Sequence, residues 1–273
     1  MTATLTGVDV APPVASAKRR RRAPGWLAVV PLLVFTAIAF GIPALAMLNG
    51  AFSVKDQATG ASSYSTENLT ASLHGAYLTA LVGSVKLSAV SAGLGALLGL
   101  PLAQVVVTSR FRALREAVLT ASGVLANFGG VPLAFAFVAT LGNAGVLTVH
   151  LGLKDTGWDL YSFWGLVIVY LYFLIPLMVL TITPALDGPR TQWREAAQNN
   201  GATPVQYWRH VALPVLLPSL LGGLVLLFGS AFAAYATAAA MVGSSIPLVT
   251  LQIADAISGN VLVGQENVAL ALS

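Results

Sequence analysis

The 273-residue sequence contains no cysteine, which excludes disulfides, thiolate metal ligands and cysteine nucleophiles. Charge is also scarce, because only 9% of the residues are Asp, Glu, Lys or Arg, whereas a typical soluble domain has about 25%. Hydrophobic residues make up 56% of the chain. This composition is typical of a protein whose solvent is lipid.

Motifs for catalysis and for nucleotide binding are missing as well. No Gly-Lys pair occurs, so a P-loop is excluded, and no HExxH motif is present. The three histidines, His74, His150 and His210, lie far apart in the sequence. The sequence therefore lacks the clustered residues that a protease or a metal enzyme needs. We expect no catalytic residue, metal ligand or bound cofactor. If ATP drives this protein, another polypeptide must bind the nucleotide.

Apolar runs dominate the rest of the chain. Five of them are long enough to cross a bilayer as helices: residues 26–48, 77–107, 117–141, 161–183 and 217–242. The third run contains Gly129-Gly130-Val131-Pro132, which predicts a kink at mid-membrane. We expect an outer loop at 49–76, a partly re-entrant or interfacial segment at 142–160, and a short amphipathic interfacial helix at 246–258.

The placement of basic residues predicts the orientation. Most of the 14 Lys and Arg lie in three segments, 18–22, 110–115 and 190–209, which share a side if the spans alternate. Basic loops stay in the cytoplasm, so we expect a cytoplasmic N-terminus. Residues 1–24 read as a disordered basic leader and 25–273 as the membrane domain. A signal peptide is the alternative, but the uncharged run 26–48 exceeds the about 7–15 residues of a signal core.

The most informative stretch is polar and lies between the fourth and fifth apolar runs. We call residues 187–216 the elbow, because the pattern predicts two short helices joined at an angle. Pro189 suits a first helical position, where the missing N–H costs nothing. Gly201 follows the first helix and is the natural left-handed residue after its cap.

The second helix of the elbow has its own start and stop signals. Thr203 is predicted as the N-cap, and Gln206 stands three residues later, which is the spacing of a capping box. Pro214 and Pro218 are predicted to end this helix before the next apolar run, because proline lacks the N–H that a helix interior needs.

The elbow also carries a fixed-spacing motif. Its anchors are Glu195, Ala196, Ala197, then Gly201 after three residues, then Val211, Leu213 and Pro214 after nine more. This resembles the cytoplasmic EAA-x3-G-x9-I-x-L-P signature of importer permeases of the ATP-binding-cassette superfamily, with Val for Ile as the one departure. The alternative is an amphipathic surface elbow whose letters agree by chance. The second and third apolar runs look like the polyamine, phosphonate, sulfate, iron(III) and thiamine branch of type I importers, and the resemblance covers residues 25–273.

The resemblance implies an all-α membrane protein: a type I importer transmembrane domain with five complete spans, the start of a sixth, and a cytoplasmic coupling loop. Its ATPase-coupling residues would be Glu195, Ala196, Ala197, Gly201, Leu213 and Pro214. Glu195 would pair with a basic residue of the partner or cap a local backbone group. The implied partners are ATP-binding cassette ATPase subunits that hold ATP and Mg, a second permease that is a copy or a paralogue, an extracytoplasmic solute-binding protein and membrane lipid, without nucleic acid. The implied location is the bacterial cytoplasmic (inner) membrane.

Polar residues within the apolar runs are candidates for a solute path. Lys86, Asn127 and Tyr235 are the residues we select, since an ionisable residue inside a membrane indicates a functional site by default. Lys86 has an alternative role, because a lysine near a helix end also snorkels to the headgroups. The polar side chains within the runs either line a path or satisfy kinked backbone, and this applies to Asn127, Gln104, Tyr170 and Tyr235 alike.

The predicted function is therefore that of a permease subunit that passes a small solute, such as a polyamine, a phosphonate or a related small ion. A secondary carrier or channel is the alternative, and it would need ionisable residues at mid-membrane, which are missing here. A purely structural anchor would not need the elbow motif. Residues 267–273 resemble the opening of another apolar helix, so we expect the sequence to lack most of a sixth span.

Overall fold

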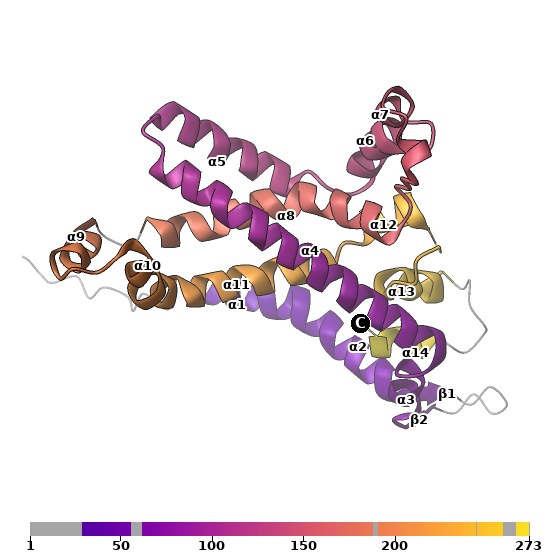
Figure 1. The fold of residues 1–273 in the computed structure, drawn as a ribbon. Coiled ribbons are helices and arrows are strands. Elements are labelled where there is room, and N and C mark those ends of the chain that lie inside the picture. The colour runs from indigo at the N-terminus through magenta and orange to yellow at the C-terminus, as the bar shows by residue number, and fades with distance from the viewer. Residues whose placement is uncertain (1–28, 56–61, 188–190, 244, 259–265, 273) are drawn as a thin grey trace, which may run out of the picture. The chain divides into compact units, whose positions relative to one another are not determined.

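The computed structural model of the protein describes residues 29–55, 62–187, 191–243, 245–258 and 266–272 (Figure 1). These residues are predominantly helical, with one two-stranded antiparallel sheet. Contacts divide the chain into two units, residues 1–46 and residues 47–273. An all-α membrane domain was the fold predicted from the apolar runs, and the described structure confirms it.

The first unit holds most of the first apolar helix. It contains α1 (Val30–Thr36), a π-helical turn η2 (Ala37–Gly41) and the start of α2 (Ile42–Phe52). The π turn directly precedes Pro43, whose missing N–H and bulky ring disturb the regular bonding of the preceding turn. The helix continues to Phe52 rather than ending near residue 48 as predicted. Residues 26–28, where the predicted span begins, lie outside the described residues.

The predicted outer loop at 49–76 is wrong in part, because it contains regular structure. Strands β1 (Ser53–Lys55) and β2 (Ser62–Tyr64) pair as an antiparallel hairpin, and α3 (Glu67–Ser72) follows. The buried Asn68 amide donates hydrogen bonds to the carbonyls of Ala51 (3.2 Å) and Ser53 (2.9 Å) and so joins α3 to the hairpin. These elements are too short to show a hydrophobic periodicity in the sequence. Backbone pairing forms the hairpin, and the Asn68 side chain joins α3 to it.

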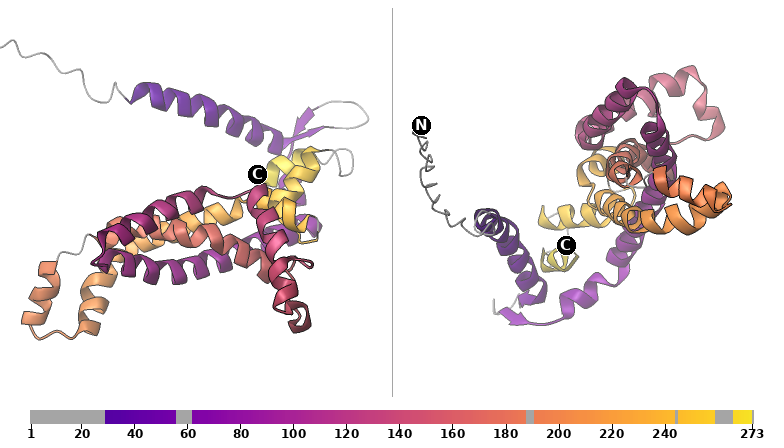
Figure 2. Two further views of the ribbon diagram at one scale, coloured as in Figure 1. Left: turned by 90° about the horizontal axis from the view of Figure 1, so that it is seen from above. Right: turned by 90° about the vertical axis from the view of Figure 1, so that its left-hand side faces the viewer.

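Four helices lie side by side in the second unit: α4 (Gly75–Thr108), α5 (Arg112–Asn127), α8 (Phe163–Leu186) and α11 (Leu213–Phe232) (Figures 1 and 2). Small residues of α4 set the contact with α8. A Cβ atom added to Gly99 would lie 2.7 Å from the Cβ of Met178, and one on Gly95 would lie 3.1 Å from the Cβ of Leu174. The small-residue face that the sequence shows is therefore required for close helix packing.

The third apolar run is not one kinked helix. Helix α5 ends at Asn127, and α6 (Val131–Leu141) is a separate helix, followed by α7 (Val146–His150) and a 3-10 turn η3 (Leu153–Thr156). Gly130 has a φ of +75° and Pro132 lies in the first turn of α6, so the Gly-Gly-x-Pro sequence ends one helix and starts another. The predicted kink is a complete break.

Among the described residues, five helical stretches are long and apolar enough to cross a membrane: Val30–Phe52, Gly75–Thr108, Val131–His150, Phe163–Leu186 and Pro204–Phe232. Five was the predicted number. The third stretch, however, covers α6 and α7 instead of the predicted 117–141. Helix α5 carries Arg112, Arg115 and Glu116 near its start, and these charges lower its apolar character.

The second helix of the elbow runs without interruption into the fifth apolar helix. Helix α10 (Pro204–Tyr207) continues through a π-helical turn η4 (Trp208–Ala212) into α11. The prediction that Pro214 and Pro218 end the second helix is therefore wrong. As with Pro43, the π turn lies directly before Pro214, where a regular turn would meet the proline ring.

The predicted fifth span, 217–242, is also wrong in extent. Helix α11 ends at Phe232, and a separate helix α12 (Tyr235–Val242) follows. The buried Tyr170 hydroxyl donates a hydrogen bond of 2.9 Å to the carbonyl of Ala234 at this break. That partner satisfies a backbone group which the interruption leaves without its helical bond. The sequence gives no sign of the break, because neither glycine nor proline occurs at residues 232–235.

Two short helices complete the described chain. Helix α13 (Val249–Ile257) confirms the predicted short helix after the fifth span, and α14 (Glu266–Leu272) follows. The Ser84 hydroxyl of α4 accepts a 2.9 Å hydrogen bond from the Val249 backbone N–H. Helix α13 therefore packs against α4, with its first turn fixed by a side chain that is distant in sequence.

Candidate functional site

The elbow projects beyond the bundle. Helix α9 (Thr191–Asn199) lies past the ends of α4, α5 and α8, and α10 lies level with those ends (Figures 1 and 2). Residues 188–190 lie outside the described residues, so the predicted role of Pro189 as a first helical residue is not described. The other residues of the elbow that the sequence singles out, from Glu195 to Pro214, are described.

Gly201 makes the turn between the two helices. Its φ is +76°, and no heavy atom lies within 4 Å of the position that a Cβ would take. The backbone N–H of Gly201 donates to the Gln198 carbonyl, and that of Ala202 donates to the Ala197 carbonyl, both at 2.9 Å. These two bonds form a Schellman motif, which satisfies the last carbonyls of α9. Glycine is therefore required by its backbone conformation and not by lack of space, as predicted.

Thr203 starts the second helix with a complete capping box. Its backbone N–H donates to the Gln206 side-chain oxygen at 2.8 Å, and the Gln206 N–H donates to the Thr203 hydroxyl at 3.3 Å. Two N–H groups that the helix cannot satisfy are thus bonded reciprocally. The turn from α9 to α10 is consequently fixed at both sides by hydrogen bonds within the elbow.

Several side chains of the elbow are exposed and form what we call its exposed face. Glu195 and Ala196 are exposed, Ala197 is half-buried, and the apolar side chains of Trp193 and Val205 are 42% and 74% exposed. Among the residues that the structure describes, the Glu195 carboxylate makes no hydrogen bond or ion pair. It therefore caps no described backbone group, which leaves pairing across an interface as the other predicted role.

The π turn connects this exposed face to the membrane helices. Trp208 lines a cavity of about 240 Å³ together with residues of α4, α8 and α11, and Gln104 lies in the same wall. Leu213 and Pro214, the last anchors of the motif, follow on the same continuous helix and are exposed. A displacement of the elbow would therefore be passed directly into α11.

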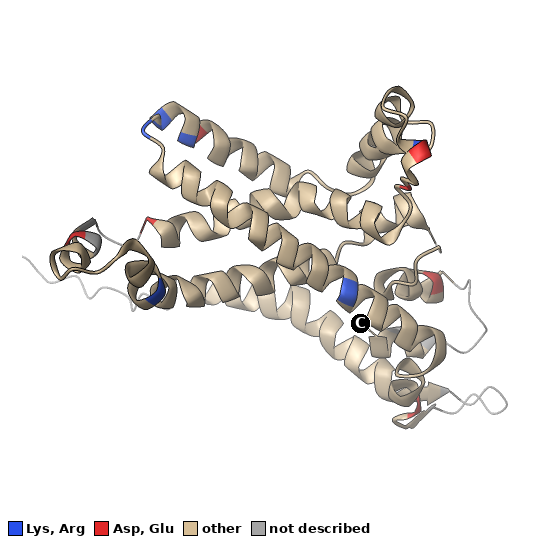
Figure 3. Ribbon diagram, in the orientation of Figure 1, with Lys and Arg blue, Asp and Glu red and all other residues tan. Residues whose placement is uncertain are grey.

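Basic residues gather at the elbow's end of the bundle. Figure 3 shows them at the connection between α4 and α5 and in η4, at the same end as α9. The Arg115 guanidinium pairs with Asp187 at 2.5 Å, and so links the start of α5 to the residue where the elbow begins. Two of the three predicted basic segments thus share an end, as a cytoplasmic face requires. The third, residues 18–22, lies outside the described residues.

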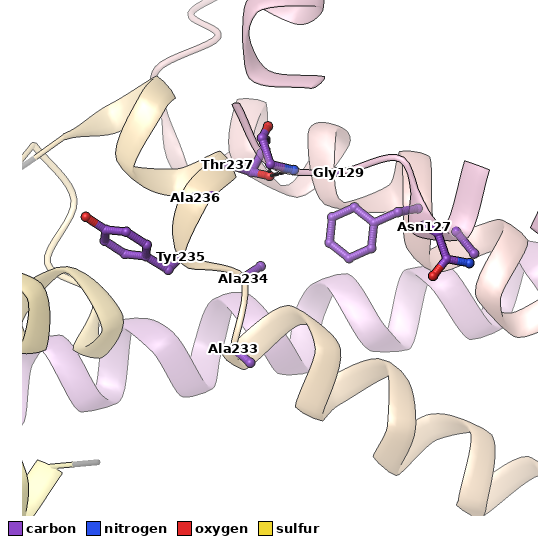
Figure 4. Close-up of a pocket in the computed structure, with 10 residues that line it drawn as sticks. Asn127, Gly129, Ala233, Ala234, Tyr235, Ala236 and Thr237 are labelled. Carbon is purple, nitrogen blue, oxygen red and sulfur yellow. Dashed lines mark hydrogen bonds between the residues drawn. The ribbon is translucent and has the colours of Figure 1, made fainter. Parts of the chain in front are cut away.

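Two of the three predicted solute-path residues line one cavity, at opposite sides of it. Asn127 and Tyr235 both line a space of about 420 Å³ at the breaks between α5 and α6 and between α11 and α12 (Figure 4). The Gly130 backbone N–H donates to the Thr237 hydroxyl at 2.9 Å and ties the two breaks together. Irregular backbone at membrane depth is tolerated where it is buried in protein or lines a water-filled cavity.

Lys86 lies elsewhere. It lines a separate cavity of about 380 Å³ on α4, so the structure does not bring it to Asn127 and Tyr235. Tyr170, weighed for the same path, is buried and bonded to Ala234, which makes it a structural residue. Thr237 was not among the residues predicted from the sequence. Its partner Gly130 is 107 positions away, and no local signal marks such a pair.

Comparison with known proteins identifies related chains. The family described as "Binding-protein-dependent transport system inner membrane component" matches residues 95–263. The molybdenum transport system permease protein ModB of Mycobacterium tuberculosis is 31% identical over 169 residues, which are 61% of this chain and 62% of that one. A probable sulfate transport system permease protein cysT of Anthoceros angustus is 33% identical over 134 residues, 45% of each chain. The chain thus matches less than two thirds of the length of these relatives.

The fold is shared with a solved structure. A chain in the crystal structure of a bacterial alginate ABC transporter, in complex with an alginate pentasaccharide-bound periplasmic protein, superposes with a TM-score of 0.66. The match covers 90% of this chain and 86% of that one, at 18% sequence identity. It covers more of the chain than the family match does, and it shows a common arrangement of helices.

Proposed function

The chain belongs to the family of binding-protein-dependent transport system inner membrane components, and on that premise we propose that it is the membrane-spanning permease subunit of an ATP-driven importer. Its elbow is the surface on which a separate ATPase subunit docks. One observation carries this proposal: an exposed elbow, turned by a left-handed glycine, continues as one helix into a membrane span.

The continuous helix supports transmission of force. Residues 204–232 form one helical stretch, so a tilt imposed on α10 by a docked subunit also tilts α11. The Schellman motif and the capping box keep α9 and α10 in one fixed turn. Rigid-body motion of helices against one another is an established way in which nucleotide-driven changes spread through a protein.

The chemistry of the exposed face supports docking. Ala196 and Ala197 present little side-chain bulk, which lets another backbone approach closely. Glu195 offers an exposed carboxylate for a basic residue of the partner, and Trp193 adds an exposed aromatic surface. Aromatic residues are enriched at protein interfaces and basic partners complement carboxylates. We assign the ATPase-coupling role to this face and to Gly201, Leu213 and Pro214.

The solute is a small ion, received from an extracytoplasmic binding protein and passed through a path formed with a second permease subunit. Relatives are named for molybdenum, sulfate, and spermidine and putrescine transport. The cavity of Asn127 and Tyr235 lies at two helix breaks, and broken helices at membrane depth build solute sites in other transporters. We assign this cavity to the solute path.

Gly201→Val tests the docking role. Valine at a φ of +76° carries a left-handed penalty of about 1–2 kcal/mol, so the turn changes its shape. We expect insertion into the membrane to persist. Co-purification with the partner ATPase subunit, and the ATPase activity of the assembly, should fall about tenfold or more, the equivalent of about 1.4 kcal/mol.

Two variants serve as controls. Gly201→Asn should keep most of the activity, because asparagine tolerates the left-handed conformation better than other side chains do. Gly222→Ala in α11 should be neutral, because no heavy atom lies within 4 Å of the added Cβ. A Gly201→Val protein that binds the ATPase and supports its activity like the parent would refute the docking role.

A further inference from the structure

A single charged side chain occurs in α4, and it lines a cavity. Lys86 shares a space of about 380 Å³ with Leu78, Thr79, Val82, Gly83 and Pro247. Its side chain is exposed. Within the described ranges, no carboxylate pairs with it and none lines this cavity. A positive charge on a membrane helix, with no described carboxylate beside it, is a candidate contact for an anionic ligand.

The length of α4 places Lys86 near one membrane boundary. Its 34 residues extend over about 51 Å, which exceeds a hydrocarbon core of about 30 Å. Residues 87–107 are an uncharged run that extends over about 31 Å, and they lead to the basic connection at 110–115. The run matches the core by itself, so Lys86 lies at the opposite boundary from the elbow, at the mouth of the spans.

The wall opposite Lys86 is fixed by close contacts. A Cβ on Gly83 would lie 2.5 Å from the Pro247 carbonyl oxygen, so glycine is needed for this approach. The next residue, Ser84, accepts a hydrogen bond from the Val249 backbone N–H and so fixes the first turn of α13. The segment that carries Pro247 is therefore anchored on α4, which favours a preformed cavity.

We propose that this cavity binds a tetrahedral oxyanion and that the transported solute is of this class. The inference rests on the proposed function and specifies its substrate. Lys86 supplies the charge, whereas the Thr79 hydroxyl already donates to the Gly75 carbonyl. Asp255, the acidic residue on α13, does not line the cavity. A polyamine would meet the Lys86 ammonium group at this mouth, and like charges repel, so the cavity favours anions over polycations.

Phosphate groups of lipids offer the same chemistry at the same depth, so the first experiment separates the two sources. The purified chain in lipid-free detergent is titrated with molybdate, sulfate or spermidine, and its thermal unfolding is followed. Ligands that bind the folded state raise the midpoint. We expect a rise with molybdate and sulfate in the parent that is lost in Lys86→Ala, and no Lys86-dependent rise with spermidine.

General salt effects are removed by comparison between variants. Sulfate stabilises proteins by exclusion from their surface, but this contribution is equal in the parent and in Lys86→Ala. Lys154→Ala is the matched control, because Lys154 is an exposed lysine that lies outside the cavity, and it should behave like the parent. A Lys86-dependent rise with phosphatidylglycerol, and none with the free oxyanions, would overturn the proposal in favour of a lipid site.

The second experiment measures transport. The chain is reconstituted with its ATPase, its companion permease and the loaded binding protein in phosphatidylcholine vesicles. We expect Lys86→Ala to lower the maximal rate of sulfate or molybdate uptake about tenfold or more, about 1.4 kcal/mol in the barrier, while Lys86→Arg keeps most of it. Uptake of spermidine alone, or oxyanion uptake unchanged in Lys86→Ala, overturns this inference and leaves the proposed function intact. Failure of the parent chain to assemble with any ATPase refutes the proposed function instead.

Discussion

The elbow is a turn between two helices, and so are the breaks between α5 and α6 and between α11 and α12, which we call the outer breaks. Different hydrogen bonds hold the elbow and the outer breaks. In the elbow, every hydrogen bond of the turn joins residues three to five positions apart, as between Thr203 and Gln206 or Ala202 and Ala197. At the outer breaks, Gly130 bonds to Thr237 across 107 positions, and Tyr170 bonds to Ala234 across 64. The elbow turn is held by local bonds, whereas the breaks have local bonds and depend on tertiary bonds as well.

This difference separates two mechanical roles. A turn that satisfies its own backbone needs no support from the bundle, so it can project and present an exposed face. A break whose backbone groups bond to distant residues is stable only while those residues stay in place. We infer that the elbow moves as a rigid unit, whereas the outer breaks hold their shape only as long as α6, α8 and α12 keep their positions.

Helix α11 joins the two regions. It continues from α10 at the elbow and ends at Phe232, just before the break at Ala234. The bond from Tyr170 and the tie between Gly130 and Thr237 therefore lie at the far end of the helix that the elbow would tilt. A tilt of α11 imposed at the elbow would therefore displace its other end, beside the cavity that Asn127 and Tyr235 line.

Thr237→Val should have the largest effect on the outer breaks. Thr237 is 3% exposed, and valine has its shape but cannot accept the Gly130 N–H. Leaving that group unsatisfied costs about 1–3 kcal/mol, so we expect a lower thermal unfolding midpoint in detergent. Thr237→Ser should restore most of the loss. An unchanged midpoint in Thr237→Val would mean that the long-range tie does not stabilise the breaks.

The sequence predicts the elbow well because its bonds are local. The left-handed glycine at 201 and the capping box at Thr203 and Gln206 are visible in the spacing, and the structure confirms both. The end of the second helix was predicted wrongly. Pro214 and Pro218 indicate a stop when read alone, but a π turn relieves the clash and the helix continues.

The outer end could be predicted only in part. The Gly-Gly-x-Pro sequence indicates an interruption at 129–132, although its extent was underestimated. The break after Phe232 has no local cause, since it depends on the Tyr170 hydroxyl 64 positions earlier. Asn127 and Tyr235 were chosen as polar residues in apolar runs, and both line one cavity. The Asn127 amide also donates a 2.9 Å hydrogen bond to the Gly123 carbonyl of its own helix. The separate cavity of Lys86 depends on how α13 packs on α4, which periodicity does not reveal.

Thr203→Ala should have a smaller effect, confined to the elbow. Loss of an N-cap costs about 0.5–2 kcal/mol, and here the capping box involves only Thr203 and Gln206. We expect faster hydrogen exchange at residues 203–207 with little change in the global unfolding midpoint. Thr203→Ser is the control that retains the cap. A drop in the midpoint as large as that of Thr237→Val would show that the elbow is not an independent unit.

Arg115→Gln should have the smallest effect, because its ion pair is partly exposed. The side chains of Arg115 and Asp187 are 34% and 41% exposed, and pairs of this kind contribute about 0–1 kcal/mol. This pair is nonetheless the one described ion pair that ties the bundle to the start of the elbow, so its loss should weaken ATPase association more than it weakens folding. Arg112→Gln is the matched control, since Arg112 pairs within α5 with Glu116. Equal ATPase association in both variants at low salt, where such pairs are strongest, would show that the elbow does not depend on this tie.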